Sequence, residues 1–324
     1  MLDRLVIATR ESPLALWQAR FIKEALEARH PGLVVSLLGM RTAGDRWLST
    51  PLSEVGGKGL FIKELEQALL SGAAHLAVHS MKDVPALLEE PFVLGAIGFR
   101  DDVRDALVGP AGTTVAGLPQ GARVGSASLR RRAQLLARRP DLDVQPVRGN
   151  VGTRLGKLDA GEFDALLLAA AGLRRLGLEA RVAEYLTLDD SLPAAGQGAL
   201  GIECLADNSD VLRLVATLDD PVCAPCVRAE RGVSAGLGAD CSAPLGAYAE
   251  ALPGGKLLLK AVLADPDGRE RLRASATGAD PAELAARVVA DLRDQGAARI
   301  LARLAEPRLA EPRLSEPGTP GSHA

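Results

Sequence analysis

Short apolar runs alternate with amphipathic, helix-like stretches along the first hundred residues. Four of the runs have the length of strands and are too short for helices: residues 5–8, 33–40, 76–78 and 92–99. Ser12-Pro13 supplies an N-cap and a first-turn proline for a helix to about Arg29, and residues 60–70 repeat apolar positions at helical spacing. This alternation predicts a parallel or mixed α/β domain.

The same alternation continues in a second stretch, from about residue 106 to 192. Its strand-like runs lie near residues 123–124, 144–147 and 165–168, and helices fill the gaps. The charged segment 100–105 between the two stretches is a hinge candidate. Residues 193–198 break the pattern and lead to a strand-like run at 199–203, which we interpret as the chain's return to the first domain. Two such crossovers create a cleft whose walls can move about paired hinges.

A different pattern begins after Pro221. A helix leads toward Cys241, and the strand-like residues 248–277 are interrupted by two turns rich in Gly and Pro. An amphipathic helix from Pro281 to about residue 305 closes a small α+β domain, and the Pro-rich repeat beyond it predicts a disordered tail. The predicted organisation is domain 1 from 1–99 with 199–217, domain 2 from 105–193, domain 3 from 221–306 and a tail from 307–324.

Composition narrows the class of protein. The chain has 324 residues, of which 47% are hydrophobic and 24% charged, as is ordinary for a globular protein of two or three domains. A net charge of −3 does not favour binding to nucleic acid or to an anionic membrane, since each needs a basic excess. Neither an apolar leader nor a stretch of membrane-spanning length is visible, so we expect a cytoplasmic protein.

The most informative segment is the end of the apolar run at 76–78, because Ser80, Lys82 and Asp83 follow it in close order. In open α/β sheets, the carboxyl end of a strand faces the ligand crevice. A carboxylate beside an ammonium group at that place could act as an acid, a base or a counter-charge to a cationic intermediate. A surface Lys-Asp pair of little energetic value is the alternative that this segment leaves open.

Arginines dominate the beginning of the second stretch, with eight of them against two aspartates between residues 123 and 154. Ser126 and Ser128 lie in a small-residue turn between a strand and a helix start, where backbone N–H groups and hydroxyls bind anions. Another such turn, also with arginines, follows one unit later. We expect five arginines to line a cleft that binds a ligand with several carboxylates: Arg10, Arg130, Arg131, Arg148 and Arg154.

Two further motifs do not indicate nucleotide or metal chemistry. The segment Gly56-Gly57-Lys58-Gly59 lacks the spacing of a phosphate loop, and we interpret it as a flexible lid with Lys58 at its tip. His75 and His79 lie in a strand and its exit, so they do not form a helical metal pair. No metal site is expected from these residues.

The four cysteines are expected to be thiols, because four in so long a chain do not make a disulfide framework. Cys223 and Cys226 have the spacing of a redox or zinc pair, but the sequence offers no second pair. Cys241 differs, because it lies in a loop of small residues where an electrophile can reach a thiol. By local sequence alone, an ordinary loop cysteine remains the alternative.

Together these segments resemble the porphobilinogen deaminase (hydroxymethylbilane synthase) family. The resemblance rests on Cys241 in its loop and on seven motifs in order: IATRESPLA at 7–15, GGKGLF at 56–61, HSMKDVP at 79–85, SLRR at 128–131, RGNVGTR at 148–154, AGL at 171–173 and PAAGQG at 193–198. It implies two α/β domains like those of type II periplasmic binding proteins and a small α+β C-terminal domain. Ser126 stands where the family commonly has Thr, which keeps the hydroxyl.

The resemblance also implies an activity. The family's enzymes are transferases of porphyrin and heme biosynthesis, and we expect this chain to be a monomer. They condense four porphobilinogen molecules head to tail, with loss of ammonia, on a covalently bound dipyrromethane primer, and then release hydroxymethylbilane by hydrolysis. Loss of ammonia gives an azafulvene cation, which the free α-carbon of the bound pyrrole chain attacks. A two-lobed solute-binding or ligand-sensing module without catalysis is the competing hypothesis.

Site residues follow from the resemblance position by position. Asp83 is the expected catalytic residue, and Cys241 is expected to carry the dipyrromethane cofactor through a thioether. Further cofactor contacts are expected from Ser80, Lys82, Ser126, Ser128, Arg130 and Arg131. Substrate contacts are expected from Arg10, Ser12, Lys58, Arg148, Arg154 and Arg175.

Overall fold

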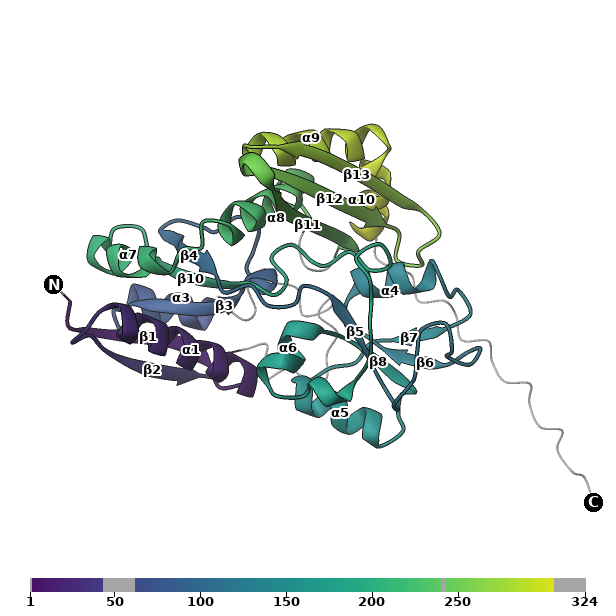
Figure 1. The fold of residues 1–324 in the computed structure, drawn as a ribbon, viewed down its shortest axis with the longest axis horizontal. Coiled ribbons are helices and arrows are strands. Elements are labelled where there is room, and N and C mark those ends of the chain that lie inside the picture. Colours follow the sequence, from purple (N-terminus) through teal and green to yellow (C-terminus); the bar gives the residue numbers. More distant parts are fainter. Residues whose placement is uncertain (1, 43–61, 240–242, 306–324) are drawn as a thin grey trace, which may run out of the picture.

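The chain folds around three β-sheets, which occupy separate lobes in Figure 1. The computed structural model describes residues 2–42, 62–239 and 243–305. Lys58, Cys241 and the predicted tail from 307 to 324 lie outside the described residues. Within the described part of the chain, no helix has the length and apolar character needed to cross a membrane.

The first sheet has five strands in the order β2-β1-β3-β10-β4. They are β1 (Arg4–Arg10), β2 (Val34–Met40), β3 (Leu76–Ser80), β4 (Phe92–Gly98) and β10 (Leu200–Leu205). Strand β1 runs parallel to β2 and β3, whereas β10 lies antiparallel between β3 and β4. The strand between β3 and β4 therefore comes from a part of the chain about a hundred residues later.

Helices cover both faces of this sheet because side chains alternate between its faces. Leu5 and Ile7 of β1 pack with α1 (Pro13–Arg29) and α7 (Ser209–Val215), while Ala8 packs with α3 (Lys63–Leu70). Helix α1 begins as the sequence predicts: the Ser12 hydroxyl accepts a hydrogen bond from the Ala15 backbone N–H, and a proline occupies the first turn.

The second sheet has the order β7-β6-β8-β5-β9. Its strands are β5 (Asp105–Val108), β6 (Arg123–Gly125), β7 (Asp143–Gln145), β8 (Ala165–Ala169) and β9 (Val182–Tyr185). Helix α4 (Leu129–Leu136) packs on one face, and α5 (Val151–Asp159) and α6 (Ala170–Arg175) pack on the other. As in the first sheet, three parallel strands are followed by one antiparallel strand and an edge strand.

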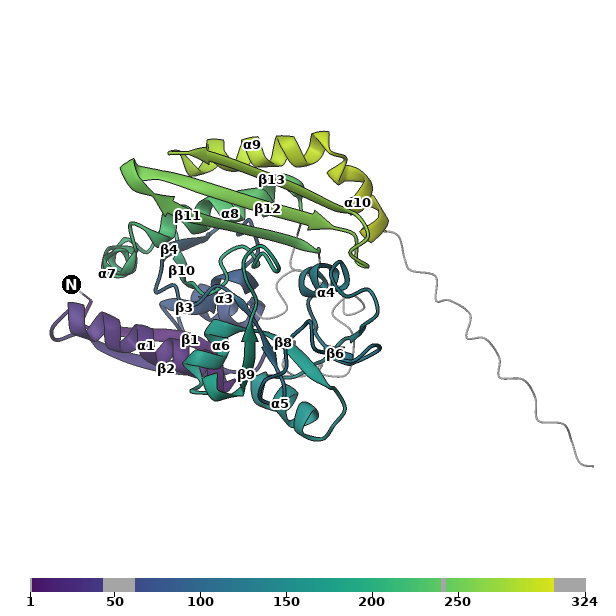
Figure 2. The ribbon, with the colours of Figure 1, turned by 45° about the vertical axis from the view of Figure 1, so that its right-hand side comes forward.

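The third sheet is antiparallel and has three strands, β11 (Leu245–Leu252), β12 (Lys256–Ala264) and β13 (Arg271–Gly278). Helices α8 (Cys223–Leu237) and α9 (Pro281–Asp294) pack against each other and against this sheet around one apolar core. Figure 2 shows α9 along the sheet, with α10 (Ala297–Ala305) following it. The two α/β sheets and this small third unit confirm the expected fold class.

Three local predictions differ from the structure. The predicted helix from Pro281 to residue 305 is two helices, because Gly296 adopts a φ of 101° that ends the helical path. Strand β5 begins at Asp105, inside the segment expected to be a charged hinge. Strand β9 was not predicted, because it is a half-buried edge strand with no continuous apolar run.

The two crossover segments between the α/β sheets, residues 99–104 and 186–199, touch at Gln197 and Gly198. The Asp101 N–H donates to the Gly198 carbonyl at 3.1 Å, and the Gln197 side-chain amide donates to the Val103 carbonyl at 2.7 Å. Gly198 has a φ of +87°, and a Cβ there would lie 2.5 Å from the Asp101 oxygen. Only glycine allows this approach of the two segments.

A buried ion pair ties the crossovers to the third unit. Glu230 of α8 is fully buried and accepts hydrogen bonds from both terminal nitrogens of Arg100, at 2.7 and 3.1 Å. It also accepts from the backbone N–H groups of Gly196 at 2.7 Å and Ala249 at 2.8 Å. The Arg100 guanidinium lies over the Tyr248 ring, 5.2 Å from its centroid. One carboxylate thus connects both crossovers, α8 and β11.

We expect Glu230→Gln to lower the free energy of unfolding by about 3 kcal/mol, because removing the charge of one partner leaves the other charge buried and unpaired. Chemical denaturation measures this loss. Glu250→Gln is the matched control, since Glu250 on β11 is only half-buried and makes no ion pair within the described residues; its effect should stay within about 0.5 kcal/mol. A loss for Glu230→Gln as small as that of the control would contradict this account.

Candidate active site

Strand β3 delivers polar side chains to a pocket. Its buried run ends after Val78, and the one-turn 3-10 helix η1 (Met81–Asp83) follows. Met81 is buried and anchors this turn, whereas Asp83 is exposed. The polar residues lining the pocket are Arg10, Ser12, Gln18, His79, Ser80 and Asp83. Among the described lining residues, Asp83 supplies the one carboxylate.

Neighbouring side chains fix the polar groups of this pocket. The Gln18 amide of α1 donates to the Ser80 hydroxyl at 2.8 Å. His79 Nε2 lies 2.7 Å from an oxygen of the fully buried Glu203 on β10. His79 therefore pairs with the carboxylate of Glu203, which does not line the pocket. The Ser80 hydroxyl lines the pocket and is held in place by Gln18.

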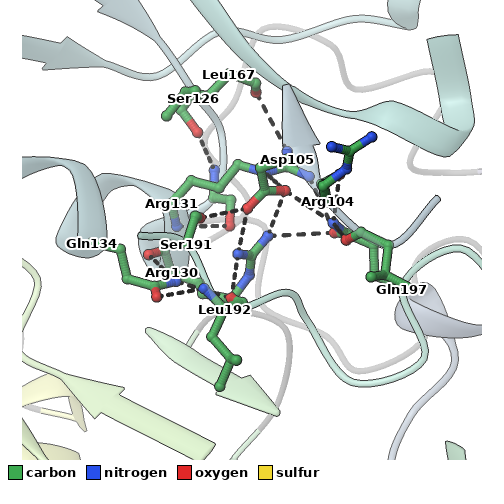
Figure 3. A network of polar contacts seen from close by, with 12 residues as sticks. Arg104, Asp105, Ser126, Arg130, Arg131, Gln134, Leu167, Ser191, Leu192 and Gln197 are labelled. Atoms are coloured by element: carbon green, nitrogen blue, oxygen red, sulfur yellow. Dashed lines mark hydrogen bonds and ion pairs between the residues drawn. The ribbon is translucent and has the colours of Figure 1, made fainter. Parts of the chain in front are cut away.

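Arg130 and Arg131 converge on one buried carboxylate, Asp105 (Figure 3). Arg130 Nη1 lies 2.6 Å from one Asp105 oxygen, and Arg131 Nε lies 2.7 Å from the other. Burial alone would raise the pKa of Asp105, but the two guanidinium groups outweigh burial and hold the pKa well below its usual range. The two arginines and Asp105 together keep one surplus positive charge.

The turn before these arginines forms the predicted helix start. The Ser128 hydroxyl is the N-cap of α4 and accepts from the Arg131 backbone N–H at 3.4 Å. The Ser126 hydroxyl accepts from the Ser128 backbone N–H at 3.3 Å. Local capping thus determines where α4 begins and in which direction Arg130 and Arg131 leave it.

The other predicted arginines differ in their settings. Arg154 on α5 donates through Nε to the Gly149 carbonyl at 2.8 Å, and Arg148 is half-buried just before that helix. Arg175 on α6 is buried and lies over the Trp17 ring, 5.7 Å from its centroid. Its guanidinium donates to carbonyls of both crossovers, at Phe99 and Gly198. In this structure Arg175 therefore links α6, α1 and the crossovers.

The described part of the site contains more buried and half-buried cations than anions. Burial lowers the pKa of the Lys82 ammonium to about 8 and that of the Arg154 guanidinium to about 10. Burial likewise lowers the pKa of Arg131, Arg148 and Arg175. Desolvation disfavours the charged form of each group, and an adjacent anion would restore it. This arrangement suits a ligand that carries several carboxylates.

Arg130 also has one hydrogen-bond donor without a partner among the described residues. That donor is its Nε, which is buried. A buried donor without a partner is costly, and a ligand oxygen would remove that cost. The residues present therefore fit a bound polycarboxylate.

Arg231 of α8 holds the chain just beyond Asp83. It donates to three consecutive carbonyls, those of Val84 at 3.1 Å, Pro85 at 2.7 Å and Ala86 at 3.0 Å. Burial lowers the pKa of Arg231 to about 10. The helix that leads toward Cys241 is thus fastened to the turn that carries Asp83.

Two predicted site residues, Lys58 and Cys241, lie outside the described residues. The remaining cysteines, Cys204, Cys223 and Cys226, are buried free thiols. Burial raises the pKa of Cys204 and of Cys223 to about 12. A thiol with so high a pKa is a poor nucleophile at neutral pH.

A larger hollow of about 830 Å³ lies elsewhere, between the 109–119 loop and residues 158–164 of the second α/β unit. Its cationic lining residue, Arg181, already pairs with Asp159. The charged residues that line this hollow are Asp159, Asp164 and the paired Arg181, which do not suit an anionic ligand. The pocket at Asp83 remains the better candidate for the active site.

The sequence interpretation missed several residues that support the site. Asp105 was assigned to a hinge, although the apolar run after it indicates a strand start. Gln18 and Arg231 carry no local pattern that distinguishes them from ordinary helix residues, whereas Gln197 belongs to the motif at 193–198 but was assigned no role. The partners of Gln18, Gln197 and Arg231 lie 62, 66 and 147 residues away along the chain, and only the fold brings them together.

Comparison with known proteins gives a consistent assignment. Residues 5–213 match the model of the porphobilinogen deaminase dipyromethane cofactor binding domain, and residues 224–294 match that of the porphobilinogen deaminase C-terminal domain. A porphobilinogen deaminase of Thiobacillus denitrificans is 54% identical over 92% of this chain and 97% of its own length. One from Chromobacterium violaceum is 54% identical over 95% of this chain and all of its own length.

Solved structures give weaker similarities. The VFT2 domain of Bordetella pertussis BvgS aligns with 67% of this chain and 86% of its own, at 17% identity and a TM-score of 0.41. A probable amino-acid ABC transporter extracellular-binding protein of Bacillus subtilis aligns with 67% of this chain and 90% of its own, at 10% identity and a TM-score of 0.43. Scores this low support no inference.

The family assignment therefore rests on the sequence matches and agrees with the site. The two models together span the three sheets, and the two relatives match over nearly their whole length. The chain belongs to the porphobilinogen deaminase family.

Proposed function

We propose that this chain condenses four porphobilinogen molecules head to tail, with loss of ammonia, on a covalently bound dipyrromethane primer, and then releases hydroxymethylbilane by hydrolysis. One observation carries the proposal: among the described residues that line the pocket, Asp83 supplies the one carboxylate, beside Arg10, Ser12 and Ser80. The charges of the half-buried Lys82 and Arg154 interact with it. Porphobilinogen carries an acetate and a propionate on a pyrrole ring. Its carboxylates suit the cations, and its ring N–H suits Asp83.

Asp83 is the proposed catalytic residue. Its carboxylate accepts a hydrogen bond from the pyrrole N–H, so it orients the ring. The same negative charge stabilises the cation that forms when ammonia leaves porphobilinogen. It can also accept the proton that the ring must lose after the new carbon–carbon bond has formed.

The cationic and hydroxyl groups are proposed to hold the carboxylates of the pyrroles. Carboxylates of the cofactor are assigned to Ser80, Lys82, Ser126, Ser128, Arg130 and Arg131, with Cys241 as the point of attachment. Carboxylates of the incoming substrate are assigned to Arg10, Ser12, Lys58, Arg148, Arg154 and Arg175. Arginine suits this task because its planar fork binds carboxylate in a bidentate manner.

The dipyrromethane cofactor agrees with the residues present. The longer matched region is the cofactor binding domain, and the unpaired Arg130 Nε and the half-buried Lys82 lie within it. When bound, the cofactor supplies the nucleophilic pyrrole carbon on which the chain begins. The described residues orient its carboxylates and keep Asp83 beside the reacting ring.

A turnover measurement tests the proposed activity. Purified protein is incubated with porphobilinogen, and ammonia and tetrapyrrole are measured together. We expect four ammonia molecules for each hydroxymethylbilane. A solute-binding module would bind porphobilinogen without releasing ammonia, so binding without turnover would favour that alternative.

Lys82 gives a prediction on pH. Its pKa is lowered by burial to about 8, and a bound carboxylate would raise that pKa, so binding is coupled to protonation. The rate at which adduct-free protein acquires the cofactor from porphobilinogen should therefore be steady below pH 8 and fall above it, as Lys82 loses its charge. Intact mass during incubation with porphobilinogen from pH 7 to 9.5 measures this dependence.

Lys82→Arg is the matched control, since a guanidinium stays charged over this range. The substrate's own ionisation affects both proteins equally, so the comparison isolates Lys82. The variant should lack the additional fall in the rate of cofactor assembly above pH 8. Identical pH profiles for the two proteins would rule out a role for the Lys82 charge.

We further propose a cytoplasmic, monomeric enzyme that does not bind nucleic acid. The net charge of −3 supports the last point. We also propose the domain boundaries 1–99 with 199–217, 105–193 and 221–306, followed by a tail from 307 to 324. The three sheets support the first three. Gel filtration with light scattering would test the monomer.

A further inference from the structure

Gln197, in the segment 193–198, is a buried residue that has no role in the mechanism proposed above. Gln197 is fully buried, and both ends of its amide are engaged (Figure 3). Its oxygen accepts from Nη2 of Arg131 at 3.2 Å and from Nη2 of Arg130 at 3.4 Å. Its nitrogen donates to the Val103 carbonyl at 2.7 Å and to Asp105 at 3.0 Å. One neutral side chain therefore contacts both arginines and their carboxylate.

The backbone around Gln197 fixes where that amide lies. Gly196 has a φ of +73°, and a Cβ there would come within 2.7 Å of the Met81 Cβ and 3.5 Å of the Lys82 nitrogen. The Arg100 Nε donates to the Gln197 carbonyl at 3.2 Å. The segment thus packs directly against the turn that carries Lys82 and Asp83, while its side chain reaches the arginine pair.

Charge explains why an amide suits this position. Arg130, Arg131 and Asp105 sum to one positive charge, which a ligand carboxylate can neutralise. A carboxylate in place of Gln197 would cancel that charge from inside the protein and would repel the Val103 carbonyl and Asp105. An apolar side chain in place of Gln197 would leave the guanidinium groups of Arg130 and Arg131 each without one hydrogen-bond acceptor.

We propose that Gln197 is a positioning residue that orients the Arg130–Arg131 pair toward the carboxylates of the bound pyrrole chain and preserves the pair's surplus positive charge. Because Gln197 belongs to the segment that contacts Met81 and Lys82, it also sets the spacing between the arginines and Asp83. This inference rests on the proposed function.

The experiment compares Gln197→Glu and Gln197→Met with matched variants of Gln134. Gln134 is also a buried amide, but its hydrogen bonds go to backbone groups of Leu192 and Arg130 and to no guanidinium. Each purified full-length protein is measured for KM and kcat with porphobilinogen, for the fraction that carries the covalent adduct by intact mass, and for thermal unfolding.

For Gln197→Glu we expect KM to rise about tenfold or more, as loss of hydrogen bonds to charged groups implies, with a smaller change in kcat. We also expect a lower adduct fraction than in the wild type. Gln197→Met should show the same direction. Gln134→Met and Gln134→Glu should lower the unfolding temperature but leave KM and the adduct fraction unchanged.

Three results would overturn the proposal. The first is that the Gln197 variants have the same KM and adduct fraction as the Gln134 variants. The second is that the Gln197 variants differ from the wild type only in their unfolding temperature. The third is failure of both Gln197 variants to fold while both Gln134 variants fold, since this would assign Gln197 a structural role. An inactive wild type without adduct would instead reject the proposed function itself.

Discussion

Asp83→Ala is expected to lower kcat for porphobilinogen by a factor on the order of 10²–10⁴, the range that a positioned acid or base contributes. The fold should remain intact, because Asp83 is exposed and its side chain has no hydrogen bond or ion pair within the described residues. Steady-state kinetics measures the loss, and thermal unfolding together with intact mass shows whether fold and adduct are retained.

Two variants sharpen this test. Asp83→Asn keeps the size of the side chain but removes its charge, so it should be impaired to a similar degree if cation stabilisation matters. Glu89→Ala removes an exposed carboxylate six residues later and should have little effect. Tetrapyrrole formation near the wild-type rate in Asp83→Ala would reject the assigned role.

The structure explains how Asp83 stays available among so many cations. Arg131 and Arg154, the guanidinium groups whose charges interact with Asp83, are both held by other groups. Arg131 pairs with Asp105 at 2.7 Å, and Arg154 donates to the Gly149 carbonyl at 2.8 Å. No ion pair joins Lys82 to Asp83 in the described part of the chain. Asp83 therefore keeps a carboxylate that lines the pocket and is bound to no side chain among the described residues, as its proposed role of binding a pyrrole N–H requires.

Local patterns predicted much of the fold. The apolar run before Ser80 predicted β3, and Ser12-Pro13 and Ser128 predicted the starts of α1 and α4. Each depends on neighbours within a few residues, so a single sequence contains the information. The strand ends also indicated where polar groups would gather, because parallel strands deliver them to one edge of a sheet.

Long-range partners could not be predicted in this way. Asp105 lies 25 residues before Arg130, and its immediate neighbours in sequence suggested a charged surface segment. The fold instead buries Asp105 completely. Arg175 is predicted to bind a substrate carboxylate, and the structure adds contacts of its guanidinium with the crossovers and Trp17 that the sequence did not indicate. Such contacts depend on which strands pair, and local sequence does not determine that pairing.

Cys241→Ser is expected to abolish both the covalent adduct and turnover. A serine hydroxyl remains protonated at neutral pH and is a far weaker nucleophile than a thiol, so the thioether cannot form. Without the primer, condensation has no carbon on which to begin. Cys223→Ala is the matched control, since Cys223 is buried with its pKa raised to about 12, and this variant should keep the adduct.

The intact mass of the purified protein tests the central claim most directly. Wild-type protein from cells that supply porphobilinogen should exceed its sequence mass by one dipyrromethane, and Cys241→Ser should have its sequence mass alone. A fully folded wild type that carries no added mass would contradict the account.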